Sequence, residues 1–98
     1  MNHTIYICQN PNVTADELEN IAKDNAISIC DNIEKNAPQH ANRLLYCTIY
    51  AYLYNMLLLA HPHIITSTRA AQLEEFLGQM LAISGIKIDA IISFTHEH

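Results

Sequence analysis

Two histidine pairs are the residues whose types and spacing come nearest to a metal site. In His61-Pro62-His63 and His96-Glu97-His98, two imidazoles lie close along the chain, and imidazole is a common zinc ligand. A structural zinc site normally has four ligands in paired short spacings, usually with cysteine, but Cys8, Cys30 and Cys47 lie elsewhere. We therefore predict no physiological metal site.

Thiols and carboxylates are the other groups that could do chemistry. A catalytic cysteine needs a partly exposed thiolate beside a base, whereas Cys30 and Cys47 fall on apolar helix faces, where cysteine is usually a small hydrophobic residue. Carboxylates that lie close together in the sequence occupy helix positions that face solvent, and acid–base catalysis favours a buried one. With two glycines in the chain, no phosphate-binding loop is present. We predict that the protein is not an enzyme and binds no cofactor.

Acidic side chains on the first long helix are candidates for binding a partner. They include Asp16, Glu17, Asp24 and Asp31. Negative charge of this kind steers association with a basic protein surface, such as the nucleic-acid-binding groove of another protein. The alternative is that these side chains only keep the helix surface solvated.

A row of tyrosines is the second candidate. Tyr46, Tyr50 and Tyr54 recur every four residues, with Arg43 one turn before them, so a helix would place them on one side as a ridge. Tyrosine and arginine are favoured at protein interfaces because they combine large contact area with a polar tip. The alternative is that these tyrosines line the edge of the core.

Composition and charge narrow the classes of partner and the compartment. The net charge is −5 and the few Lys and Arg form no cluster, which argues against direct nucleic-acid binding. The apolar run from Leu44 to Ala60 is shorter than the ~20 residues of a membrane span and has tyrosines at its centre. An odd number of cysteines and no secretory signal pattern indicate a cytoplasmic protein with reduced thiols. The length predicts one domain over residues 1–98.

The elements that must position these side chains are mainly helices. Thr14-Ala15-Asp16-Glu17 is a capping box, and Val13 and Leu18 can form a hydrophobic staple around it. This predicts a helix that runs to about Asn36, because Pro38 disfavours helical geometry at Ala37. Its apolar stripe should be buried: Leu18, Ile21, Ala22, Ala26, Ile29, Cys30 and Ile33.

Two more long helices are predicted, over Gln39–His61 and Arg69–Ser84. The first is apolar nearly all round and should be the central helix. Ser67 or Thr68 can cap the second at its start, and Gly85 at its end. Its predicted buried residues are Leu73, Phe76, Leu77, Met80, Leu81 and Ile83.

The chain termini are β-prone. Thr4–Cys8 is predicted as a short strand or extended arm, and 86–94 as a short helix or as a strand that pairs with it. The fold class is therefore mainly α: a compact bundle of three long helices with a central apolar second helix, a β-prone arm at the N-terminus and a short helix or strand at the C-terminus.

We expect a non-enzymatic protein-binding domain. The favoured class is an inhibitor or regulator that occludes a surface of another macromolecule, such as a mobile-element inhibitor of anti-CRISPR or anti-restriction type, or an immunity protein. The alternatives are an obligate homo-oligomer, such as a homodimer in which the tyrosine ridge packs on its own copy, or a secretion chaperone. A small metal-binding protein is the last of these classes.

Overall fold

The first long helix follows the local signals in the sequence. A computed structural model describes residues 2–7, 10–83 and 87–96. Helix α1 spans Ala15–Asn36, as predicted, and the Glu17 amide donates a 3.2 Å hydrogen bond to the Thr14 hydroxyl. Val13 and Leu18, on either side of this cap, are both buried. The predicted stripe of α1 is buried as well, except that Ile21 is partly exposed.

The second helix begins later than predicted. Helix α2 spans Leu45–Leu59, whereas Pro38–His40 forms a short 3-10 helix, η1. Between them Ala41 is extended, and the Asn42 side-chain oxygen accepts a 2.9 Å hydrogen bond from the Leu44 amide. Asparagine side chains compete with helix in this way, and the prediction of a helix from Gln39 was therefore wrong at its start.

The third helix is capped one residue earlier than expected. Helix α3 spans Ser67–Ile83, and the Thr66 hydroxyl accepts a 3.2 Å hydrogen bond from the Arg69 amide. The cap is thus Thr66 and not Ser67 or Thr68. Ser84, the predicted last residue of this helix, and Gly85, its predicted C-terminal cap, lie outside the described residues.

The two termini meet in a parallel sheet. Strand β1 (His3–Ile7) pairs with β2 (Ile92–His96), in a register that runs from His3 opposite Ile92 to Ile7 opposite His96. A four-residue helix, α4 (Ile88–Ile91), leads directly into β2. Both alternatives for the C-terminal segment therefore occur in succession. Cys8, the last residue of the predicted arm, is outside the described residues.

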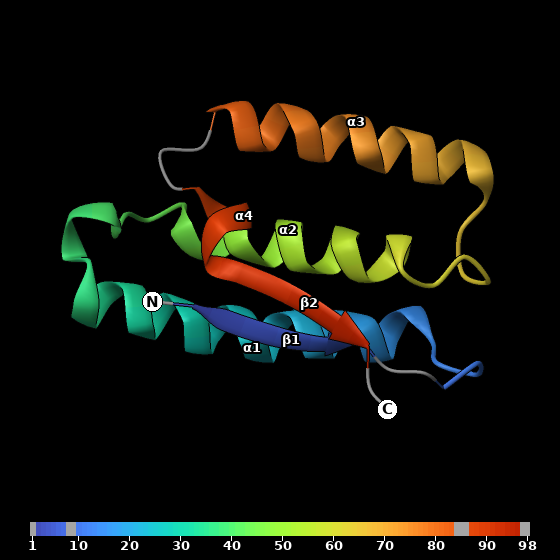
Figure 1. The fold of residues 1–98 in the computed structure, drawn as a ribbon, viewed down its shortest axis with the longest axis horizontal. Coiled ribbons are helices and arrows are strands. Elements are labelled where there is room, and N and C mark those ends of the chain that lie inside the picture. The colour runs from blue at the N-terminus through green and yellow to red at the C-terminus, as the bar shows by residue number, and fades with distance from the viewer. Residues whose placement is uncertain (1, 8–9, 84–86, 97–98) are drawn as a thin grey trace.

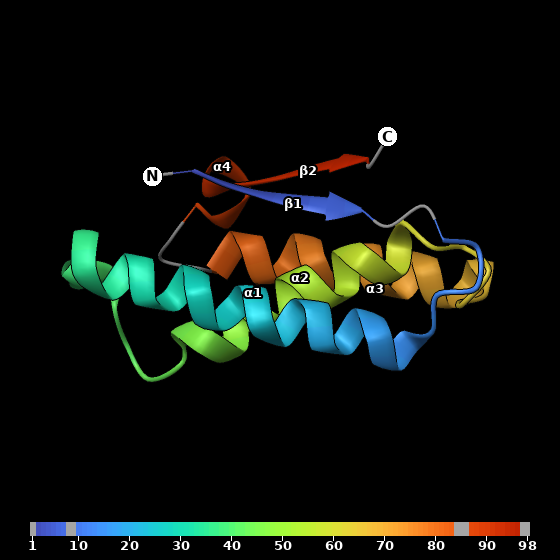
Figure 2. The same cartoon turned by 90° about the horizontal axis from the view of Figure 1, so that it is seen from below.

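The elements form two layers (Figures 1 and 2). Helices α1, α2 and α3 lie side by side with α2 in the middle, and the sheet lies over one face of the layer, above α1 and α2. The protein is mainly helical, as predicted, but the sheet makes it a layered fold instead of a helix bundle alone. The largest fully buried side chains of the core are Leu18, Ile29, Ile33, Ile49, Leu53, Leu57 and Ile88.

No helix in the described ranges has the length and apolar character needed to cross a membrane.

Candidate binding surface

The predicted tyrosine row is present on α2. The rings of Tyr46 and Tyr50 stack with centroids 6.1 Å apart and planes inclined by 11°, and those of Tyr50 and Tyr54 follow at 5.9 Å and 31°. Four-residue spacing places the three side chains on one side of the helix. Each outer ring thus restricts the rotamers of the central one.

The row lies on the face of the helix layer that the sheet leaves open. Tyr52 is buried, and its ring contacts Phe94 of β2 at 6.1 Å between centroids, so this side of α2 faces the sheet. Successive helix residues are rotated by about 100°. Tyr50 and Tyr54, two positions before and after Tyr52, therefore point to the opposite face, which we call the open face.

Helix α1 contributes a charged pair beside the row. Lys23 and Glu19 form an ion pair with a distance of 3.1 Å between Nζ and Oε1. Hydrogen bonding and attraction from Lys23, and to a lesser degree a hydrogen bond from the Tyr50 hydroxyl, lower the pKa of Glu19. Burial first, and then the charge of Glu19, raise the pKa of Tyr50. The Tyr50 hydroxyl thus stays protonated near neutral pH and can donate to Glu19.

Helix α3 adds two exposed apolar side chains. Phe76 is 46% exposed and Ile83 is 86% exposed, so the prediction that both are buried was wrong. They lie about 60–80° round the helix from the buried line of Leu73, Leu77 and Met80. Helix α3 is right-handed and runs in the direction drawn in Figure 1, so the side that carries Phe76 and Ile83 belongs to the open face. This exposure could not be predicted, because a stripe of apolar residues does not reveal how much of its width is covered.

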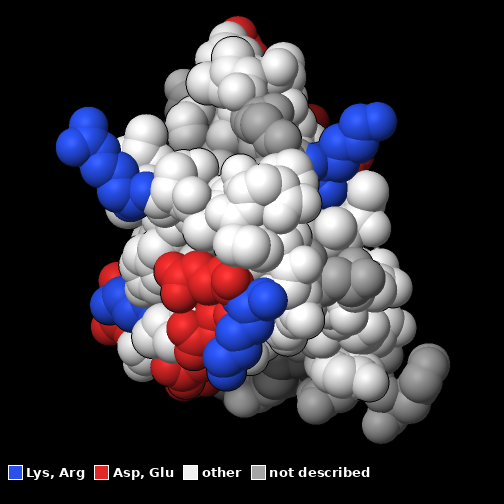
Figure 3. Space-filling view, turned by 90° about the vertical axis from the view of Figure 1, so that its left-hand side faces the viewer, with Lys and Arg blue, Asp and Glu red and all other residues white. Residues whose placement is uncertain are grey.

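Three of the four acidic candidates form a row of their own on α1. Asp16, Glu17, Asp24 and Asp31 are all exposed. Glu17, Asp24 and Asp31 follow one another at seven-residue steps, which is nearly two helical turns, so they form one row along α1. This row is rotated by about 100° from Lys23, whereas Asp16 is seven residues before Lys23 and therefore lies on the same side of α1 as Lys23. Figure 3 shows carboxylates gathered over α1 with basic side chains beside them.

Arg43 is not on a helix with the tyrosines. It is exposed and lies in the turn before α2. The predicted ridge therefore consists of Tyr46, Tyr50 and Tyr54, with Arg43 near its start but outside the helical repeat.

A depression of about 250 Å³ lies on α1 and is lined by Ser28, Asp31, Asn32 and Lys35. All four residues belong to the same helix, so the depression is a surface feature and not a space between elements. It carries one carboxylate and one ammonium group, both exposed. We assign it no chemistry.

The first histidine pair is held by backbone carbonyls. His61 is buried, and its Nδ1 lies 2.6 Å from the Leu57 carbonyl oxygen, to which it must donate. The His63 Nε2 likewise donates to the Val13 carbonyl oxygen at 3.2 Å. The two rings meet edge to face at 5.9 Å. The hydrogen bond from His63 to Val13 ties the loop after α2 to the segment before α1.

The second pair, His96 and His98, extends beyond the described residues, as does Glu97. In the parts of the chain that the structure describes, no group of three or more His, Cys, Asp or Glu side chains is arranged to hold a metal ion. His3 on β1 has its Nε2 buried without a hydrogen-bond partner among the described residues, and burial is the main cause that lowers its pKa. His3 is therefore neutral near pH 7.

The cysteines on α1 and α2 differ in their exposure to solvent. Cys30 is buried, and burial, followed by the charges of Glu34 and Asp31, raises the pKa of its thiol. Such a thiol is a poor nucleophile. Cys47 is exposed on α2, so the interpretation of Cys47 as a small hydrophobic residue that packs on an apolar helix face was wrong.

Comparisons of the chain with protein-family models, with curated proteins and with solved structures found no match.

Proposed function

We propose that this protein is a non-enzymatic binding domain that contacts another protein through the open face of its helix layer. The observation that carries the proposal is the row of neighbouring rings of Tyr46, Tyr50 and Tyr54 on the face of α2 that points away from the sheet. Tyr50 and Tyr54 also pack against the core, but all three side chains keep part of their surface exposed, so a partner can contact them on the open face.

The open face has the composition of an interface. Its centre is aromatic, the Glu19–Lys23 pair lies beside it, and Phe76 and Ile83 extend it over α3. Interfaces commonly combine an aromatic centre with a polar rim. Because neighbouring rings already restrict the tyrosine rotamers, less side-chain entropy is lost when a partner covers them.

The acidic row supports a narrower proposal about the partner. Glu17, Asp24 and Asp31 lie on the flank of α1, and the chain as a whole has a net charge of −5. Such a charge distribution increases the association rate with a basic partner. An inhibitor that covers a basic groove, of anti-CRISPR, anti-restriction or immunity type, is the member of the class that this row favours.

A second copy of the chain is the alternative occupant of the open face. Phe76 and Ile83 favour it, because exposed apolar side chains of this size are commonly covered in oligomers. A homodimer would explain the tyrosine row without a foreign partner.

Site-specific photocrosslinking in the native host can test the proposal. A photoreactive phenylalanine analogue would replace Tyr46 or Tyr54, and in a matched control Tyr6, an exposed tyrosine on the sheet surface that faces away from the helices. We expect one discrete product from the α2 positions that is missing from the Tyr6 control, and mass spectrometry would identify it. A product made of two copies of this chain would support the homodimer. Identical products from all three positions, or none from α2, would count against the open face as an interface.

A further inference from the structure

The sheet is narrower than the helix layer beneath it. Packed helices lie about 8–10 Å apart, so three of them span about 20 Å between their outer axes, whereas two paired strands are only about 4.8 Å apart. Figures 1 and 2 show the sheet over α1 and α2. On this face α4 covers one end of the seam between α2 and α3, and the rest of the seam is left without a covering strand.

The outer edge of β2 lies on the side of this seam. In Figure 1, β2 is the strand nearer to α3, and in the described part of the chain the sheet consists of β1 and β2 alone. The edge also lacks the features that usually prevent further pairing. Neither strand contains proline, lysine, arginine, aspartate or glutamate, and the pairing register has no bulge.

The opposite edge of the sheet is a poorer site. Strand β1 lies over α1, which is the last helix on that side of the layer. A strand added there would have no helix seam to cover. An additional strand is therefore better supported beside β2.

The uncovered seam offers both apolar and acidic contacts. Met56 of α2 is one helical turn after Tyr52, which faces the sheet, and it is only partly buried against the core, as are Leu81 and Phe94. Glu74 of α3 is exposed. It is rotated from the buried line of α3 in the opposite direction to Phe76, and because Phe76 lies on the open face, Glu74 lies on the sheet side.

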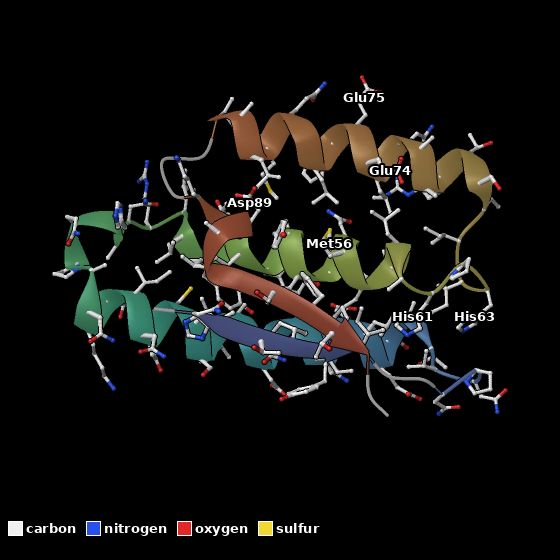
Figure 4. All side chains as sticks on the ribbon, in the orientation of Figure 1. Met56, His61, His63, Glu74, Glu75 and Asp89 are labelled. Atoms are coloured by element: carbon white, nitrogen blue, oxygen red, sulfur yellow. The ribbon has the colours of Figure 1, made fainter. Side chains whose placement is uncertain are left out.

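A second carboxylate stands near the start of β2. Asp89 of α4 is exposed, and it lies close enough to Tyr52 for its charge to add to burial in raising the pKa of that hydroxyl. In the described ranges, the structure pairs neither Glu74 nor Asp89 with a cation. Figure 4 shows both residues with Met56.

We propose that the outer edge of β2 binds an extended, basic segment of a partner protein as a third strand of the sheet. Main-chain hydrogen bonds to β2 supply the affinity in this mode of binding, and alternate side chains of the segment supply the specificity. Apolar side chains on one face of the segment cover Met56 and Leu81, and a lysine or arginine reaches Glu74 or Asp89.

A second copy of this chain fits this edge less well. Its own strands, His3–Ile7 and Ile92–His96, contain no lysine or arginine that could pair with the two carboxylates. Pairing of β2 with β2 would also bring together two chains with a net charge of −5 each. This site is on the opposite side of the helix layer from the tyrosine row, so it can be tested independently of the open face.

The first experiment measures binding of two peptide probes to the full chain by fluorescence anisotropy. One probe is a labelled peptide of about eight residues that alternates valine and lysine, and the other alternates valine and glutamate. We expect the valine–lysine peptide to bind at least about tenfold more tightly and to shift the backbone amide resonances of residues 92–96. Equal affinities, or amide shifts that exclude β2, would overturn the proposal.

Charge-reversal variants provide the second experiment. Glu74→Lys and Asp89→Lys should each weaken binding of the valine–lysine peptide by about two- to fivefold. The matched control is Glu75→Lys, which changes the same charge at the next position of α3, where the side chain points away from α2 (Figure 4). An equal loss in Glu75→Lys would show unspecific attraction and overturn the proposal, as would a stable dimer with protected β2 amides.

Discussion

The two tyrosines on either side of α2 offer a sharp test of the layered arrangement. Tyr52 is 5% exposed and its ring packs on Phe94 under the sheet, whereas Tyr50 lies on the open face. Replacing each with alanine removes the same atoms from the same helix, two residues apart. Any difference in stability between the variants therefore reports how much of each ring is covered.

The expected difference is large compared with the stability of a domain of this size. Truncation of a buried aromatic side chain typically costs about 3–5 kcal/mol, so we expect a loss in this range for Tyr52→Ala. For Tyr50→Ala, which loses only part of its contacts, we expect about 1 kcal/mol. A domain of 98 residues has a free energy of unfolding of about 5–15 kcal/mol. Tyr52→Ala should therefore lower the melting temperature by at least about 12 °C, and Tyr50→Ala by about 4–8 °C.

Urea unfolding followed by circular dichroism measures this difference directly. The denaturant slope should be similar in both variants, so the shift in midpoint gives the change in free energy. A Tyr50→Ala variant that is destabilised as much as Tyr52→Ala would refute the assignment of Tyr50 to the open face. It would place the tyrosine row in the core and remove the main support for the proposed function.

Three further results are expected. Burial, and secondarily the charge of Asp89, raise the pKa of Tyr52. The contribution of the Tyr52 hydroxyl to stability is therefore complete below the unfolded pKa of about 10 and is lost as pH rises through the higher folded value. The urea midpoints measured at about pH 9 and pH 11 should accordingly differ less in Tyr52→Phe than in the wild type. Thr14→Ala should destabilise the protein by about 1 kcal/mol in urea unfolding through loss of the α1 cap, and an unchanged midpoint would contradict that role. Under native conditions a maleimide should label Cys47 much faster than Cys30, as followed by peptide mass spectrometry, because only the first is exposed; equal rates would mean that the seam between α1 and α2 opens.

Helix α1 could be predicted in full because its signals are local. The Thr14 cap, the flanking Val13 and Leu18, and the block before Pro38 all lie within or next to the helix. The predicted start of α2 was wrong because a local hydrogen bond, from the Leu44 amide to the Asn42 side chain, competes with helix formation at this point. Hydrophobic periodicity does not report such a bond.

The candidate surface was predicted in part. Spacing was enough to place Tyr46, Tyr50 and Tyr54 in one row, because helix geometry is regular. It could not show which face the row occupies, since that depends on where β2 lies. The exposure of Phe76, Ile83 and Cys47 was missed for the same reason: a helix that is apolar on several sides does not indicate which side lacks a neighbour.

The register and parallel direction of the paired terminal strands were the least accessible features, because their pairing was only one of two alternatives. Composition marked both segments as β-prone, but the register of His3 with Ile92 joins residues from opposite ends of the chain. Nothing near either strand specifies this partner. The pairing follows from the helices, whose packing brings the two segments over the same face of α1 and α2.

Parallel pairing of β1 with β2 also imposes an order on biosynthesis. Residues 3–7 are translated early but have no strand to pair with until residues 92–96 have left the ribosome. The three long helices can form and begin to associate during translation, while the first strand keeps its backbone groups and the apolar side chains of Ile5 and Ile7 unprotected. Closing so long a loop is slow compared with helix formation. Completion of the sheet should thus be the last folding event, and a nascent chain stalled before residue 92 should remain sensitive to proteases at residues 3–7.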